Sequence, residues 1–157
     1  MKSPKAMKSP KAMNPRLEFT IGASDSTHLR FLVKVWRTNA QLQKARHKAG
    51  KNFKDKIPVC DAFCYRHHER HSEDLTLGEI HFCVPKLEVN TVAHEAFHAA
   101  VGYAQWVRPI NSKHPEDSRD LVADEPVVEE SLADSVGYMT EGILWNLRKN
   151  RLKVKPL

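Results

Sequence analysis

The sequence predicts a single α+β domain, and three observations support this fold class. Apolar residues alternate with polar ones over residues 17–21 and again over 79–84, which is typical of strands with one buried face. Longer segments near 91–103 and 127–150 suit helices, because small apolar residues recur along one side of the first. The 157 residues are 41% apolar, enough for one core, and no apolar run approaches the ~20 residues of a membrane span.

The N-terminal segment, residues 1–15, is expected to be a disordered basic tail, followed by one domain over 16–157. It holds a direct repeat, Met-Lys-Ser-Pro-Lys-Ala, at 1–6 and 7–12, with almost nothing to bury. Residues 1–56 carry 14 Lys and Arg against 3 Asp and Glu, whereas the remainder is acidic. This charge permits a weak nucleic-acid contact, but a solvated tail and a basic helix end explain it more simply.

The elements before the motif region are expected to form one core helix and a small, mostly antiparallel sheet. Residues 17–21 supply the first strand. A helix capped by one of residues 24–26 then runs to about Lys48, because its sequence is dense in apolar residues and ends in cations. Two further strands, 57–65 and 79–84, are joined by a polar hairpin connection.

A His-Glu-x-x-His motif lies in the helix that begins near residue 90. At about 100° per residue, His98 lies only ~40° round from His94 and one turn further on, so both imidazoles can reach one cation. Zinc favours such nitrogen ligands, and a catalytic zinc site needs three protein ligands with one position open. Glu95 borders the same side of the helix, where its carboxylate can take a proton from water.

The C-terminal helix, 127–150, offers the third ligand. Glu130 and Asp134 are four residues apart and therefore stack on one face of this helix. Glu129 lies ~100° away from Glu130, and Glu125 precedes the helix, so both are alternatives. Acidic residues at a helix N-terminus are also favoured by its dipole without any metal, which explains Glu125 and Glu129 better than Glu130.

His-Glu-x-x-His followed on a later helix by Glu-x-x-x-Asp resembles the gluzincin branch of the zincin metallopeptidases. In size the chain is similar to small phage, plasmid and ImmA/IrrE-type metallopeptidases. The resemblance implies that His94, His98 and Glu130 bind Zn²⁺ and that Glu95 is the general base. It also implies that Asp134 hydrogen-bonds a ligating imidazole, which would fix the tautomer and raise its basicity.

The same resemblance implies a minimal zincin-like fold, in which a core helix, the metal helix and the glutamate helix pack on the sheet. The strand before the metal helix, 79–84, would form the upper edge of the cleft and pair with a peptide substrate. In large gluzincins a histidine from a separate C-terminal domain stabilises the transition state, and the resemblance implies that another residue would take this role here. Tyr103, Tyr138, His81 and His114 are the candidates for that role.

Cysteine and histidine gather in one further segment, which contains Cys60, Cys64, His67, His68 and His71. Their spacing matches no usual zinc pattern, so they are either a second metal site or small buried side chains. The three cysteines are an odd count, which argues against a disulfide framework and makes a reducing cytoplasm the expected location.

The function expected from the motif is that of a zinc metalloendopeptidase acting on a protein or peptide substrate. Two other classes stay open. One is a regulatory module that keeps the zinc and the fold without turnover. The other is a basic nucleic-acid-binding protein with a structural metal, although structural zinc usually has a closed thiolate-rich shell.

Overall fold

The computed structural model describes residues 13–25, 27–49, 60–67, 75–107 and 126–156, with the side chains of 107 and 126–130 left out. Its elements are β1 (Leu17–Gly22), β2 (Arg30–Trp36), α1 (Asn39–Ala49), β3 (Ala62–Arg66), β4 (Thr76–Cys83), a short 3₁₀ turn (Val84–Lys86), α2 (Val89–Val107) and α3 (Pro126–Lys149). The α+β composition is confirmed. No helix within these described parts has the length and apolar character to cross a membrane.

The four strands form one mixed sheet in the order β1-β2-β4-β3. Strands β1 and β2 pair antiparallel, as do β3 and β4, so the expected hairpin between the latter two is confirmed. The central β2 and β4 run parallel, which the sequence interpretation did not anticipate. Gly78 of β4 has no room for a side chain, because a Cβ there would collide with the main-chain oxygen of Tyr65.

The expected helix from about residue 24 to Lys48 is wrong in its first half. Residues 30–36 form strand β2, and helix α1 begins only at Asn39. The burial of β2 alternates along the strand: Phe31, Val33 and Val35 are buried beneath α2 and α3, whereas the other face is only partly buried. The cap of α1 is Thr38, whose Oγ1 accepts a hydrogen bond from the N–H of Gln41 at 3.3 Å.

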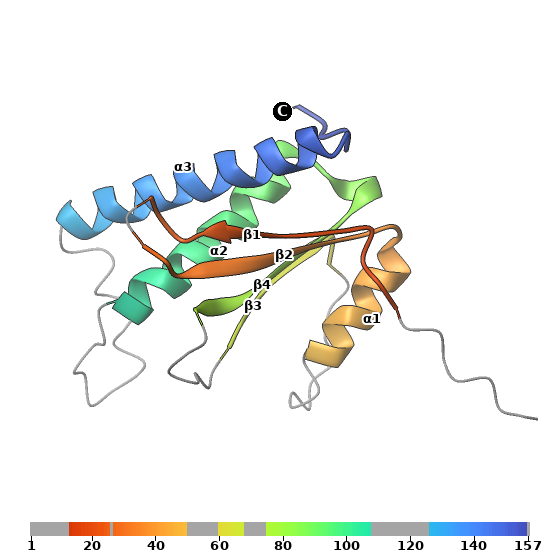
Figure 1. Ribbon diagram of the computed structural model, residues 1–157, viewed down its shortest axis with the longest axis horizontal. Helices are drawn as coiled ribbons and strands as arrows, with labels where there is room; N and C mark the ends of the chain where they lie inside the picture. Colours follow the sequence, from red (N-terminus) through yellow and green to blue (C-terminus); the bar gives the residue numbers. More distant parts are fainter. Residues whose placement is uncertain (1–12, 26, 50–59, 68–74, 108–125, 157) are drawn as a thin grey trace, which may run out of the picture.

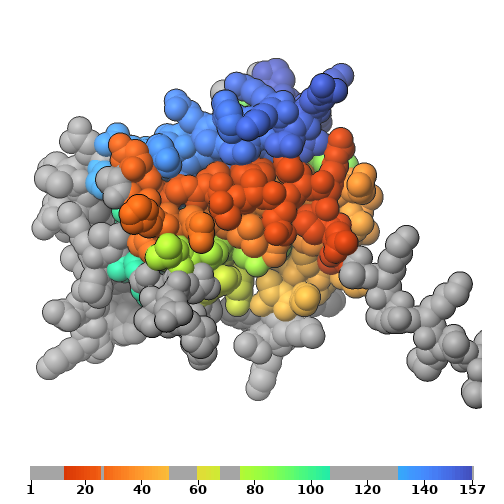
Figure 2. All heavy atoms as spheres, in the orientation of Figure 1, coloured from red at the N-terminus to blue at the C-terminus, as the bar shows by residue number. Residues whose placement is uncertain are grey.

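The sheet is covered on both faces by helices (Figure 1). Helices α2 and α3 pack on one face, where the main core contains Phe31, Phe82, Met139 and Ile143. Helix α1 packs on part of the other face, over a smaller apolar cluster that includes Trp36, Phe63 and Leu42. In the space-filling view, β1 runs along the flank of α3 (Figure 2).

The two edges of the sheet are β1 and β3, and β4 lies between β2 and β3. The expectation that the strand before the metal helix forms the cleft edge is therefore wrong, because both sides of β4 are already paired. The N–H of His67 bonds to the carbonyl of Leu77, which opposes it across the β3–β4 ladder. Since the ladder alternates, the main-chain groups of Ala62, Cys64 and Arg66 point to the other side of β3, its free side, where no further strand pairs with it among the described residues.

At the N-terminus, Met13 packs against the cluster under α1. The end of the expected tail therefore packs on the domain through Met13. Residues 1–12 lie outside the described residues.

Candidate metal and catalytic site

Helix α2 presents the His-Glu-x-x-His motif because its opposite side is built for close packing. Val92, Ala96, Ala99 and Ala100 are fully buried against the sheet and α3. Small side chains let the helix approach the sheet closely, and the motif histidines then fall on the exposed side. The expected start of this helix near residue 90 is confirmed, since it begins at Val89.

The two motif histidines converge on one point. The Nε2 atoms of His94 and His98 lie 3.1 Å apart, and the two rings are nearly perpendicular, at 81°. The two nitrogens are within hydrogen-bonding distance of each other, and this separation is close to the ~3.3 Å expected for two nitrogens bound tetrahedrally to zinc at ~2.0–2.1 Å. Burial, followed by the neighbouring His94, lowers the pKa of His98, and the neutral imidazole is the form that binds a metal.

Glu95 differs from both histidines because it is buried, with only 5% of its surface exposed. Burial raises the pKa of its carboxyl group, while the charges of His94 and Arg46 act in the opposite direction. The carboxylate also accepts a hydrogen bond from the main-chain N–H of Cys64. That N–H belongs to the free side of β3, so the edge strand positions the carboxylate expected to act as the base.

The third expected ligand lies on the helix that was predicted for it. Helix α3, expected over 127–150, is confirmed as Pro126–Lys149, and it packs against α2 (Figure 1). The side chains of Glu129 and Glu130 lie outside the description, as does Glu125. Among the described side chains, no set of three metal-ligating groups comes together. Glu130 therefore stays a predicted ligand.

Asp134, predicted to support an imidazole, is an exposed residue of α3. Within the described part of the chain, no hydrogen bond joins it to His94 or His98. Its supporting role stays a prediction together with that of Glu130.

The candidates for stabilising the transition state lie elsewhere. His81 is buried on the α1 side of the sheet, the face opposite α2. Tyr103 turns toward the end of β1, where its hydroxyl lies 3.5 Å from that of Ser24. Tyr138 is on α3 beside Gly22 of β1, at the far edge from β3. His114 lies outside the described residues. None of the three described candidates faces the histidine pair.

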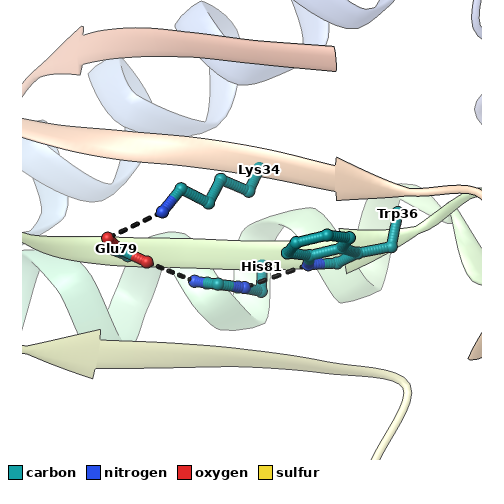
Figure 3. A network of polar contacts seen from close by, with 4 residues as sticks. All are labelled: Lys34, Trp36, Glu79 and His81. Carbon is teal, nitrogen blue, oxygen red and sulfur yellow. Dashed lines mark hydrogen bonds and ion pairs between the residues drawn. The ribbon is translucent and has the colours of Figure 1, made fainter. Parts of the chain in front are cut away.

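His81 belongs instead to a polar chain shown in Figure 3. The indole Nε1 of Trp36 donates to Nδ1 of His81 at 3.0 Å, so that nitrogen is unprotonated. Nε2–H of His81 donates to Glu79 at 2.8 Å, and Lys34 donates to the other oxygen of Glu79, also at 2.8 Å. The pKa of His81 is lowered by burial, and that of Glu79 is lowered to about 2, chiefly by its bond to His81.

The cysteine segment shows no second set of ligands among its described members. Burial raises the pKa of Cys64 to about 12, which favours a small buried thiol over a thiolate ligand. Burial also raises the pKa of Cys60, whose carbonyl accepts a hydrogen bond from Gln43 of α1. His67 is described, whereas His68 and His71 lie outside the described residues.

Two arginines near the motif were missed by the sequence interpretation. Arg46 of α1 acts electrostatically on Glu95 and hydrogen-bonds Cys60. Arg66, the last residue of β3, donates to the side chain of Gln105 on α2. No spacing signal could have indicated either residue, because each reaches the site from an element distant in sequence.

No protein-family model, curated protein or solved structure matches the chain. The reaction that the site could support is therefore inferred from the geometry of the site alone. It consists of two converging imidazoles on an exposed helix face, a buried carboxylate beside them and a free sheet edge that holds this carboxylate.

Proposed function

We propose that the chain is a zinc-dependent peptidase of the gluzincin-like type. The observation that carries the proposal is the 3.1 Å separation of the His94 and His98 Nε2 atoms, which suits one tetrahedral ion. His94, His98 and Glu130 would hold the zinc, and Asp134 would support one of the imidazoles. An ion held there supplies a Lewis acid that polarises a carbonyl group and lowers the pKa of water.

Glu95 is the proposed general base. Its burial disfavours the charged form and so raises its affinity for a proton, which suits a group that must accept one. The N–H of Cys64 opposes this shift and fixes the direction of the carboxylate. Glu95 would take a proton from the attacking water and later donate it to the leaving amine nitrogen, so the residue ends the cycle unchanged.

The peptide substrate would bind along the free side of β3. A peptide that adds a strand to this edge would use the main-chain groups of Ala62 and Arg66 and the carbonyl of Cys64, because the N–H of Cys64 already donates to Glu95. Because Cys64 also bonds Glu95, a peptide chain in this position passes beside the proposed base. This arrangement supports a peptide as substrate, with β3 taking the role that the sequence interpretation gave to residues 79–84.

The proposal is tested by comparing wild type with Glu95→Gln, both loaded with zinc, on a proteome-derived peptide library analysed by mass spectrometry. Wild type should produce new peptide ends, whereas Glu95→Gln should retain zinc and produce none, because the amide cannot accept the proton. Glu141→Gln, an exposed carboxylate on α3, is the matched control and should cut normally. Equal cleavage by Glu95→Gln would refute the proposal. Zinc binding without cleavage by wild type would favour the regulatory module instead.

A further inference from the structure

Arg66 lies over the same face of α2 that carries the histidine pair. His94, His98 and Gly102 follow one another at four-residue intervals, so they form one row along the helix. A Cβ placed on Gly102 would lie 2.6 Å from Cδ of Arg66, which shows that the arginine stem occupies the space above this glycine. Gly102 is one turn, or about 6 Å, beyond His98 along the axis.

The guanidinium group is held in this position from two elements. Arg66 is anchored through the backbone of β3, and its Nη1 donates a hydrogen bond to Oε1 of Gln105, almost one turn beyond Gly102. Its positive charge acts on His98, in agreement with this placement. A larger side chain at position 102 would require the arginine stem to shift away from its present place over the helix.

The charge of Arg66 has no acidic partner within the described residues. Gln105 is neutral, and no described carboxylate lies within ion-pairing distance of the guanidinium. The residue is also exposed, so a ligand can reach it. A guanidinium presents planar donors that match both oxygens of a carboxylate, which makes it a selective receptor for that group.

We infer that Arg66 is a specificity-determining residue that binds a carboxylate of the substrate beside the metal position. This inference rests on the proposed function, because it assumes a peptide along β3. Arg66 follows Cys64 by two residues, or ~7 Å of extended chain. In a substrate paired with β3, the carboxylate bound by Arg66 would therefore lie about two residues from the peptide bond that is to be cleaved beside Glu95. Either an acidic side chain or a free C-terminus could supply that carboxylate.

Binding can be measured without turnover by using zinc-loaded Glu95→Gln protein and fluorescence anisotropy. Three labelled Ala/Thr decapeptides serve as probes. The first carries one central Glu and an amidated end, the second carries Gln in its place, and the third is neutral apart from a free C-terminal carboxylate. We expect the Glu peptide, the free-carboxylate peptide or both to bind at least about tenfold more tightly than the Gln peptide. The stronger of the two identifies the source of the carboxylate.

Two variants in this background assign the preference to Arg66. Arg66→Gln should abolish the preference for carboxylate-bearing peptides by removing the charge. Gly102→Ala should reduce it although every charged group remains, while the helix itself should be no less stable, because Ala is favoured over Gly there. Arg148→Gln, an exposed arginine on α3, is the control and should keep the preference.

The inference is overturned if all three peptides bind equally, or if Arg66→Gln keeps the preference. Failure of the proposed function looks different, because wild type would then cut nothing in the peptide library whatever the anisotropy shows. If wild type does cut, its cleavage sites should be enriched in acidic residues or free ends about two positions from the bond. That enrichment should vanish in Arg66→Gln.

Discussion

The main-chain N–H of Cys64, on the free side of β3, donates a hydrogen bond to the carboxylate of Glu95 on α2. This bond joins the edge of the sheet to the middle residue of the His-Glu-x-x-His motif. Because the donor is a main-chain N–H, every substitution of Cys64 except proline keeps this hydrogen bond to the buried carboxylate. The bond therefore links the proposed base directly to the proposed substrate-binding strand.

Shortening the proposed base should impair catalysis without removing the metal. Glu95→Asp keeps the charge but withdraws the carboxylate by one methylene, away from the Cys64 N–H. A displacement of about 1 Å can cost on the order of 10²-fold in rate, so kcat should fall by roughly that factor. Zinc content, measured by elemental analysis, should equal that of wild type. Full activity in Glu95→Asp would show that this hydrogen bond does not position the base.

The acidic residues of α3 should separate by their effect on zinc affinity. Glu130→Ala removes a predicted ligand and should lose most of the zinc. Asp134→Ala leaves three ligands but frees an imidazole, so affinity should fall by about 10–100-fold. Competition with a chromogenic chelator measures both, with Glu129→Ala as the adjacent control. Retention of zinc in Glu130→Ala together with its loss in Glu129→Ala would transfer the ligand role to Glu129.

The polar chain of Trp36, His81 and Glu79 predicts a loss of stability in acid. The pKa of His81 is lowered in the fold, so below its usual 6.5 the unfolded chain gains a proton that the folded chain resists, and stability falls. Glu79, with a pKa of about 2 against its usual 4.5, contributes stability above pH 4.5 that is lost as pH falls toward 2. That second contribution is at most about 3 kcal/mol.

Urea unfolding of the metal-free protein between pH 7.5 and 2.5 measures this dependence. Glu79→Gln should be less stable than wild type at pH 7, and the difference should shrink as the pH falls below 4.5. Glu141→Gln, exposed on α3, controls for the general effect of removing one carboxylate. A constant difference between wild type and Glu79→Gln over this range would mean that the carboxylate of Glu79 does not titrate as described.

The cysteines of the β3 segment should be dispensable for metal binding. A Cys60→Ser, Cys64→Ser double variant should still hold one zinc per chain, because the pKa of about 12 keeps the Cys64 thiol protonated. Iodoacetamide should accordingly modify Cys64 far more slowly in the native protein than in urea. If wild type holds two zinc ions and the double variant holds one, this segment is a second metal site.

Elements with clear boundary signals could be predicted from the sequence. Helix α3 begins at Pro126, a residue that suits a first helical turn, and α2 begins within two residues of its expected start. Strand β2 was missed because Leu32 and Trp36 add apolar side chains to its second face and blur the alternation of the buried face in the sequence. Phe31, Val33 and Val35 are all fully buried.

The missed strand bears on what was missed at the site. Residues 79–84 were assigned to the sheet edge because the resemblance to zincins places the strand before the metal helix there. Pairing of β2 with β4 moves the edge to β3 and brings Cys64 and Arg66 to the motif helix. The placement of Arg66 over Gly102 is a tertiary contact between residues 36 positions apart, so neither periodicity nor motif spacing carries any trace of it.

The central claim is that His94 and His98 hold a zinc ion in one site. Isothermal titration of metal-free wild type with zinc tests it most directly, alongside His94→Ala, His98→Ala and the exposed control His47→Ala. We expect one zinc per chain for wild type and for His47→Ala, with binding lost in each motif variant. Undiminished binding in both His94→Ala and His98→Ala would contradict the account.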